Sequence, residues 1–268
     1  SLVDYILINS FVVCTDWINW NTSVWRGLDP EGTHQKWGFV LWDEDATFNH
    51  YINYTGVPND DPDAEPCYPE GISAYDPLSV IDLLNALLEN EEFTRYYNTR
   101  YMDLMNTAFK EEDMINLVEE IENSISLDMN HHFLRWGGYS MQWHHNVDNI
   151  KNFIQDRIEY LPEGMNSCYD LTGPYSVTLD VYPPDAGKIK FNSLTIDNPD
   201  YPWTGNYHGG VDMLISVEEE YNFDHWEINN HTVSDITLAN ISLSLTQDDT
   251  IRAIFSEQDV SDILVINE

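Results

Sequence analysis

Four polar side chains in the first fifth of the chain have the chemistry of a phosphate-handling metal site. Asp16 and Asn21 lie in the tryptophan-rich segment "CTDWINWN", and Asp43 and Asp45 lie in "FVLWDEDATF". Phosphoryl transfer requires a carboxylate near the attacking hydroxyl, together with an amide oxygen and a second carboxylate that hold Mg²⁺. Oxygen ligands of this kind suit Mg²⁺, and also Mn²⁺ or Ca²⁺.

The order of these residues along the chain is the order found in protein kinases. Kinases separate the catalytic Asp from a metal-binding Asn by four residues and place the main metal-binding Asp after a following strand. Asp16, Asn21 and Asp43 follow that order, with a hairpin predicted between the last two. The same acids are also typical of a solvated loop in an acidic protein, so the pattern alone leaves both interpretations open.

Three predicted elements would position these side chains. The apolar segment 2–15 is compatible with helix or strand, and its length favours a buried helix. Segments 22–26 and 36–42 are strand-like, and the Pro, Gly and Asp residues of "GLDPEGTHQ" between them predict a hairpin. Strand alternation continued past residue 42 would place Asp43 and Asp45 on one face and Glu44 on the other.

The next part of the chain predicts helices. An acidic loop with four prolines covers 55–76, and Asp76-Pro77 is a favourable N-cap and first-turn pair for a helix that follows. Apolar residues three and four apart predict three further helices, and helical character is expected to stop near Pro162. Their ranges are 91–108, 111–128 and 143–160.

From Val177 the pattern changes to short alternating strands separated by Gly, Pro, Asn and Asp, which is typical of a small all-β module. Trp226 and Phe255 are expected to anchor its core. The predicted fold class is α+β: a mainly helical lobe with a β-hairpin, then the all-β module. The predicted domains are 1–168 and 169–258, followed by a linker or the start of a further domain over 259–268.

Charge and cysteine content narrow the function classes. The 268 residues include 47 acidic and 11 basic side chains, for a formal net charge of −36. We therefore do not expect the chain to bind nucleic acid, because its negative charge repels phosphates. Insertion into membranes, or adsorption to anionic ones, is disfavoured as well. The spread-out acidity favours a secreted or cell-surface setting. Three cysteines without CxxC spacing, at positions 14, 67 and 168, allow one disulfide of undetermined pairing.

Two strings resemble a known family. "VDYILINSFVVCTDWINWNTSVWRG" followed by "KWGFVLWDEDATF" resembles the CotH kinase family (spore coat protein H-like), which are atypical secreted protein kinases. "PLSVIDLLNALLENEEFTRYYNTRYMDLMNTAF" and "IKNFIQDRIEYL" resemble the family's helical half and closing helix. The resemblance covers about residues 1–161, and W-D-x-D is its most specific part.

The resemblance implies a kinase-like carboxy-terminal lobe that uses ATP and Mg²⁺ to phosphorylate protein Ser or Thr. It implies that Asp16 is the catalytic-loop Asp, Asn21 a metal-side amide and Asp43 the main Mg²⁺ ligand, with Asp45 assisting. The family's nucleotide-binding Lys belongs to an amino-terminal lobe expected before Ser1, so this chain alone is expected to be inactive. Thr15 and Asn49 depart from the family's pattern.

The strand-rich part has a resemblance of its own. "PPDAGKIKFNSLTI", "GVDMLISVEEEYNFDHWEIN" and "DDTIRAIF" resemble the InlB B-repeat-like modules of bacterial surface proteins. This resemblance implies a spacer or adhesive element whose partner is a cell-surface component.

Other sites are less well supported. Two adjacent histidine pairs, 131–132 and 144–145, lack the partners of a zinc motif. The acids of 60–63 lack the spaced ligands of an EF-hand, and a glycosidase using Asp43 and Asp45 has no accompanying sugar-binding pattern. Two functions remain: a kinase-like enzyme acting on a protein substrate, and a non-catalytic surface protein with structural Ca²⁺ and an adhesive module.

Overall fold

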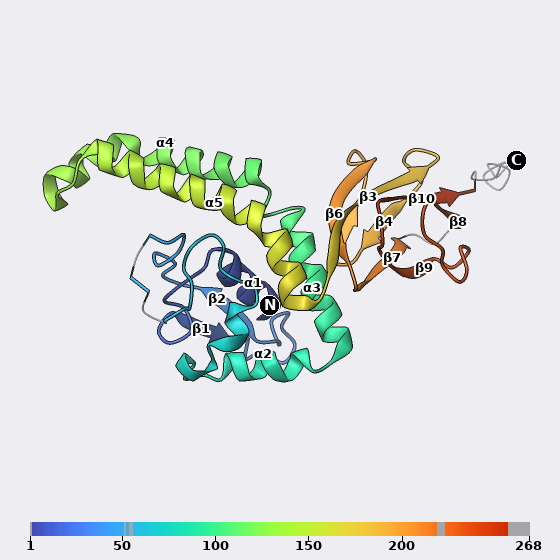
Figure 1. Cartoon of the computed structure of the whole chain (residues 1–268), viewed down its shortest axis with the longest axis horizontal. Helices are drawn as coiled ribbons and strands as arrows, with labels where there is room; N and C mark the ends of the chain where they lie inside the picture. Colours follow the sequence, from blue (N-terminus) through green and yellow to red (C-terminus); the bar gives the residue numbers. More distant parts are fainter. Residues whose placement is uncertain (1, 51, 54–55, 219–222, 257–268) are drawn as a thin grey trace, which may run out of the picture. The chain divides into compact units, whose positions relative to one another are not determined.

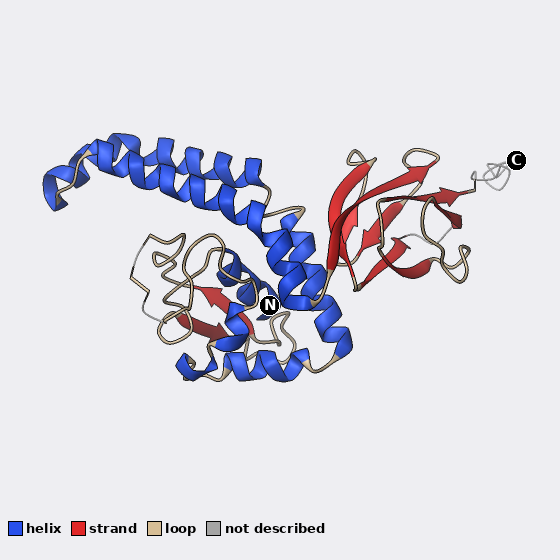
Figure 2. Cartoon of the chain, in the orientation of Figure 1, coloured by secondary structure: helices blue, strands red, loops and turns tan. Residues whose placement is uncertain are grey.

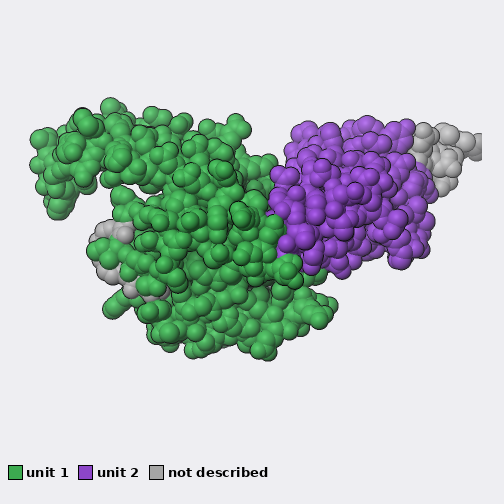
Figure 3. All heavy atoms as spheres, viewed as in Figure 1, with its two compact units in different colours: residues 1–170 green, residues 171–268 purple. Residues whose placement is uncertain are grey.

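The computed structural model describes residues 2–50, 52–53, 56–218 and 223–256. It divides into two compact units, 1–170 and 171–268, which Figure 3 shows in different colours. The first unit is mainly helical and the second is built from strands (Figure 2). The fold class is therefore α+β, as the sequence predicts. The expected linker over 259–268 lies outside the described residues.

Unit 1 begins with the helix and hairpin that the sequence predicts. Helix α1 covers Leu2–Phe11 and is buried along most of its length. Strands β1 (Thr22–Trp25) and β2 (Gly38–Leu41) pair antiparallel, with Thr22 opposite Leu41. The ring of Tyr5 stacks on Phe39 with 5.0 Å between centroids, so α1 packs directly against the hairpin.

Two short 3₁₀ helices and four α-helices complete unit 1 (Figure 1). Their bounds are η1 Tyr68–Gly71, η2 Ser73–Tyr75, α2 Val80–Leu88, α3 Glu91–Met105, α4 Glu111–Trp136 and α5 Ser140–Tyr169. The prediction that Asp76 caps α2 needs correction, because Ser79 occupies the N-cap position. Asp76 still serves the helix start, since its carboxylate accepts hydrogen bonds from the backbone N–H groups of Leu78 (2.9 Å) and Ile81 (2.7 Å).

The prediction that the helices stop near Pro162 is wrong. Helix α5 runs through Pro162 to Tyr169. A proline inside a helix removes one backbone hydrogen bond and disfavours this conformation locally. Tertiary contacts override that preference, because Leu161 and Met165 are fully buried on either side of it. A Cβ on Gly164 would lie 2.7 Å from Pro66, so the helix also approaches the preceding loop closely.

Helix α4 is also longer than predicted and has no buried residue. It ends where Gly137, with φ of +88°, adopts a conformation that side chains other than glycine rarely take. Helices α4 and α5 then run side by side as an antiparallel hairpin (Figure 1). Gln155 and His144 on α5 each contact a glutamate of α4, at 2.9 Å and 2.7 Å.

Unit 2 consists of two four-stranded sheets with orders β6-β3-β10-β8 and β5-β4-β7-β9. The strands are β3 Thr172–Tyr182, β4 Lys188–Phe191, β5 Leu194–Ile196, β6 Trp203–Gly209, β7 Asp212–Glu218, β8 Phe223–Ile228, β9 Asn240–Ser244 and β10 Asp249–Phe255. Trp226 and Phe255 are buried, as the sequence predicts for core anchors. Among the described residues, no helix combines the length and apolar character needed to cross a membrane.

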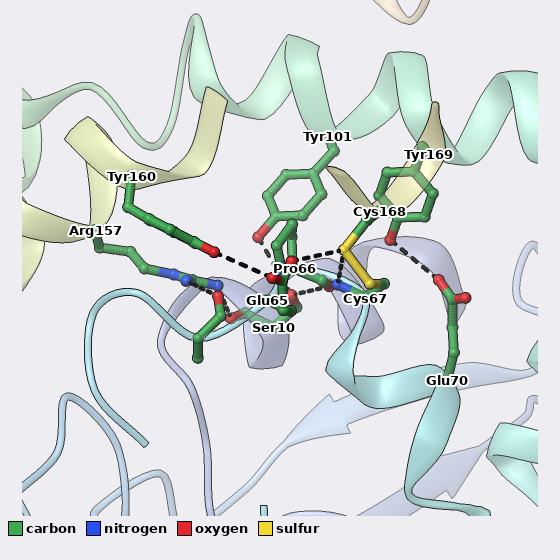
Figure 4. The surroundings of a disulfide bond; sticks show 11 residues. Ser10, Glu65, Pro66, Cys67, Glu70, Tyr101, Arg157, Tyr160, Cys168 and Tyr169 are labelled. Carbon is green, nitrogen blue, oxygen red and sulfur yellow. Dashed lines mark hydrogen bonds between the residues drawn. A yellow bond between two sulfur atoms is a disulfide. The ribbon is translucent and has the colours of Figure 1, made fainter. Parts of the chain in front are cut away.

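A disulfide closes unit 1 (Figure 4). It joins Cys67, at the start of η1, to Cys168 in the last turn of α5, across 101 positions of sequence. Tyr169 beside it donates a hydrogen bond to Glu70 at 3.1 Å, and Cys14 is the buried free thiol. The pairing that the sequence left open is therefore 67 with 168. It ties the loop after the hairpin to the closing helix.

The buried guanidinium of Arg157 holds the end of α1 in place. It donates to the carbonyl oxygens of Ser10 (3.0 Å), Phe11 (3.1 Å) and Pro62 (2.9 Å), and also to that of Ala64. The last carbonyls of a helix have no partner within the helix and carry partial negative charge, so a cation there is favourable. One side chain of α5 thus connects α1 to the acidic loop.

We expect Arg157→Lys to lower the free energy of unfolding of unit 1 by about 3 kcal/mol. A lysine ammonium cannot match the planar fork of donors, and the carbonyls it fails to reach stay buried without a donor. Urea unfolding followed by circular dichroism measures the change. The matched control is Arg135→Lys on the exposed end of α4, which should change stability by less than about 0.5 kcal/mol. Equal stability of the two variants would contradict the role of Arg157.

His208 on β6 predicts a pH dependence for unit 2. It is 1% exposed, and burial lowers its pKa to about 4. In the unfolded chain its pKa is about 6.5, so between these values the unfolded state binds a proton that the folded state excludes. The free energy of unfolding therefore falls as pH falls from about 6.5 towards 4. Lowering the pH to about 5 should cost the wild type roughly 2 kcal/mol more than His208→Gln.

Denaturant titrations of the wild type and His208→Gln at about pH 7.5 and about pH 5 measure this difference. If His208→Gln keeps the wild-type pH dependence, the buried imidazole does not control the acid sensitivity of unit 2.

Candidate functional site

Two backbone hydrogen bonds join the segment after α1 to the segment after β2. The N–H of Thr15 donates to the carbonyl of Ala46 at 2.8 Å, and the N–H of Phe48 donates to the carbonyl of Val12 at 2.9 Å. The Thr15 hydroxyl adds a bond to Ala46 at 3.2 Å. The two acidic motifs, some 25 residues apart in sequence, are therefore held against each other by their backbones. Thr15, a departure from the family's pattern, is one of the residues that join them.

Buried side chains fix the loop that carries Asp16 and Asn21. Trp17 and Ile18 are fully buried, and the Trp17 ring packs edge-on against Tyr5 with 5.5 Å between centroids. The Thr22 hydroxyl donates to the carbonyl of Trp17 and accepts a bond from the Tyr5 hydroxyl at 3.1 Å. Burial of two consecutive apolar side chains leaves the polar residues of the loop little freedom to move away.

Asp16 and Asn21 form a hydrogen-bonded pair. The Asn21 amide donates from Nδ2 to Asp16 Oδ2 at 3.2 Å. The other carboxylate oxygen, Oδ1, is buried and accepts no hydrogen bond from the part of the chain that the structure describes. The Asn21–Asp16 bond uses the amide nitrogen of Asn21 and does not involve its amide oxygen.

The acidic triplet is arranged differently from the prediction. Strand β2 ends at Leu41, and Asp43 adopts a left-handed conformation with φ of +58°, so strand alternation does not continue into the triplet. Asp43 and Asp45 are nevertheless exposed and Glu44 is half-buried. The Thr47 hydroxyl bonds the Glu44 carbonyl at 2.9 Å, which stabilises a turn. A turn, and not a continued strand, therefore exposes Asp43 and Asp45 and leaves Glu44 half-buried.

The acids influence one another electrostatically. The pKa of Asp16 is raised, chiefly because burial disfavours its charged form, and further by the negative charges of Asp45 and Asp43. All three carboxylates are therefore close enough to interact, although their oxygens do not form a group lying entirely within 4.8 Å. Burial also raises the pKa of Glu44, against the lowering effect of the nearby Cys14 thiol.

These residues fit a hard divalent cation in donor type. Carboxylate and amide oxygens are the ligands that Mg²⁺ and Ca²⁺ prefer. Asn21, Asp43 and Asp45 are the side chains that would hold it. Within the described residues, the one group of ligand atoms that does lie within 4.8 Å contains Cys67 and Cys168, whose sulfurs form the disulfide.

The other sequence candidates have local partners. His144 pairs with Glu122 at 2.7 Å on the helical hairpin. In the acidic loop, Asn49 donates to Asp61 at 2.7 Å and Asn59 donates to Asp63 at 2.8 Å. The second departure from the family's pattern, Asn49, thus ties the segment after W-D-x-D to this loop.

Three supporting residues were not found by sequence reasoning. Arg157 lies within the quoted string "IKNFIQDRIEYL", and its place three residues after Ile154 and four before Leu161, on the apolar face of the helix, was the available signal. Tyr68 donates to the carbonyl of Asn9 at 3.0 Å and helps to hold the end of α1. Glu44, which is half-buried beside the Cys14 thiol, had no signal beyond its place between two aspartates.

Comparison with known proteins identifies the family. A family model described as CotH kinase protein matches residues 1–161. The chain belongs to the CotH kinase family. The match covers α1, the hairpin, both acidic motifs and α5 as far as Leu161, and it supports a kinase-like fold for unit 1. No curated protein and no solved structure matches the chain significantly.

The electrostatic coupling predicts how the pKa of Asp16 responds to substitution. Asp45→Asn should lower it, and Asp43→Asn should lower it by a smaller amount, because each removes a negative neighbour. Asn21→Ala should raise it, since the donor that favours the ionised form is lost. Carbon-13 detected NMR titration in a chelating buffer measures these shifts, with Asp29→Asn as a control. Unchanged values in the Asp45 variant would show that the two motifs do not interact.

Proposed function

We propose that unit 1 is the carboxy-terminal lobe of a secreted CotH-like kinase, which transfers the γ-phosphoryl group of ATP to protein Ser or Thr. The observation that carries the proposal is the Asp16–Asn21 pair, held beside Asp43 by the two backbone bonds between their loops. Kinase catalysis is mostly positioning and electrostatic stabilisation, which is what such a bridge between loops supplies. Family membership supports the same conclusion.

Each residue has a proposed role. Asp16 orients the acceptor hydroxyl and takes up its proton, for which a raised pKa makes it a better base. Asn21 and Asp43 would hold Mg²⁺, and the exposed carboxylate of Asp45 would assist. The cation, when bound, neutralises charge on the phosphate oxygens. Trp17 and Ile18 exclude water from beneath the loop.

Two further features support a secreted or cell-surface location. Disulfides persist in oxidising compartments, and Cys67–Cys168 joins two segments of the matched unit. The high net negative charge favours solubility outside the cell. Unit 2, with its two four-stranded sheets, is proposed as an InlB B-repeat-like spacer or adhesive module that binds a cell-surface component.

Metal binding and phosphotransfer test the proposal together. We expect Mn²⁺, followed by electron paramagnetic resonance, to bind the wild type at least about tenfold more tightly than Asp43→Asn, because a direct ligand is lost. Incorporation of labelled phosphate from ATP should fall roughly 100-fold in Asp16→Asn. Metal binding is measured on this chain, and phosphate incorporation on a longer polypeptide that also carries the expected nucleotide-binding lobe.

Asp113→Asn, on the exposed face of α4, is the matched control and should change neither property. Equal Mn²⁺ affinity in wild type and Asp43→Asn would reject the cation site. Metal binding without any phosphate incorporation by the longer polypeptide would favour the other function, a non-catalytic surface protein with structural Ca²⁺.

A further inference from the structure

Unit 2 contains a cavity of about 490 Å³, lined by residues from the end of β3, from the loop before β6 and from β10. We call it the β3 cavity. It lies on the outer face of the sheet β6-β3-β10-β8 (Figure 1), because Val177, Leu179 and Val181 of β3 face the core while Asp180 and Tyr182 alternate with them. Sites for small ligands are cavities of this size that combine apolar surface with a few polar groups.

An ion pair forms one wall of the β3 cavity. Arg252 donates from Nε and from Nη2 to Asp180 Oδ2, each at 2.9 Å, and its Nη1 lies 3.8 Å from Glu227 Oε2. The other oxygen of Asp180 accepts a bond from the backbone N–H of Val181 at 2.9 Å. Two carboxylates therefore balance the charge of Arg252, which has five N–H donors and keeps some of them for a neutral ligand.

Two tyrosines supply the apolar part of the lining. The hydroxyl of Tyr201 accepts a hydrogen bond from the N–H of Ile189 at 2.7 Å and donates one to the carbonyl of Ile196 at 2.6 Å, so its ring is held in one position. Tyr182 also lines the cavity and is 58% exposed. A ligand that packs on Tyr182 would remove apolar ring surface from water.

Two exposed polar side chains complete the lining. Asp185, in the turn after β3, offers carboxylate oxygens that accept hydrogen bonds, and the amide of Asn198 both donates and accepts. The charged side chains of the lining are Asp180, Asp185 and Arg252, which together carry one net negative charge. An anionic ligand would meet no unpaired cation here, so the lining suits a neutral ligand with many hydrogen-bonding groups.

We propose that the β3 cavity binds a neutral saccharide, as part of a surface polysaccharide. A sugar ring carries hydroxyl groups that donate and accept hydrogen bonds, and a less polar face of C–H groups that packs on aromatic rings. Arg252, Asp185 and Asn198 supply donors and acceptors for the hydroxyl groups, and Tyr182 supplies the aromatic surface. This inference rests on the adhesive role proposed for unit 2 and names the chemical class of its cell-surface partner.

Saturation-transfer NMR of the 268-residue chain with cellotetraose, maltotetraose, mannotetraose and chitotetraose tests the proposal. We expect at least one of the four to bind with a dissociation constant of about 1 mM or lower. Tyr182→Ala should weaken that binding about tenfold or more, because the aromatic surface is lost. Asn198→Ala should weaken it about threefold or more, because a hydrogen-bonding group is lost. Tyr139→Ala, at a tyrosine of unit 1 that is 60% exposed, is the matched control and should bind like the wild type.

Charged ligands are the competing occupants of the β3 cavity. Binding of a neutral oligosaccharide should stay the same between about 50 mM and about 500 mM NaCl, because salt screens only interactions between charges. Inorganic phosphate and tetralysine are the charged probes, and neither should displace the oligosaccharide. Displacement by either probe at low salt, reversed at high salt, would assign the cavity to a charged ligand and contradict the proposal.

Two further results would overturn the proposal. If none of the four oligosaccharides binds the folded wild type, the cavity is not a saccharide site. Equal binding by Tyr182→Ala and the wild type would place the sugar elsewhere on the chain. Retention of the chain on immobilised bacterial cell walls tests the adhesive role separately: retention without oligosaccharide binding keeps that role and rejects the β3 cavity, while loss of both rejects both. Circular dichroism confirms that the compared variants are folded.

Discussion

The structure of unit 1 depends on one buried charge. The guanidinium of Arg157 is fully buried and is held by carbonyl oxygens of α1 and of the acidic loop. Removing an ion from water is strongly unfavourable unless hydrogen bonds replace its hydration, and here several carbonyls do so. Because these acceptors come from α1 and from residues 62–64, the helix end and the loop must adopt one relative position. The segment that follows α1 carries Asp16, so the position of the helix end also fixes where Asp16 lies.

A second constraint acts where like charges meet. The two backbone bonds through Thr15 and Phe48 bring Asp16 towards Asp43 and Asp45. Burial raises the pKa of Asp16, and repulsion from these two acids raises it further. A protein that concentrates carboxylates without a counter-charge forgoes stability at neutral pH, and this is common at functional sites. The proposed cation would offset this repulsion, since each carboxylate would be attracted to one positive centre. The arrangement therefore suits a metal-dependent site.

Charge is also organised over larger distances. The sequence is acidic in both units, yet the tip of the α4–α5 hairpin has no carboxylate and carries Arg135 and four histidines. Average charge predicts solubility and non-specific repulsion, while local charge decides which surfaces can approach a partner. Because α4 has no buried residue, the acid-free end of the hairpin is exposed, and its local charge can differ from the average charge of the chain.

The sequence by itself determined the elements whose signals are local. Periodicity and turn residues predicted α1, the β1–β2 hairpin and the α+β class, and residue type with spacing selected Asp16 and Asp43. The tertiary structure alone decided the continuation of α5 through Pro162, the disulfide and the role of Arg157. These features rest on contacts between residues about 100 or more apart, as in the 101-residue separation of the disulfide. Local propensity carries no information about such contacts, and buried packing outweighs it where the two disagree.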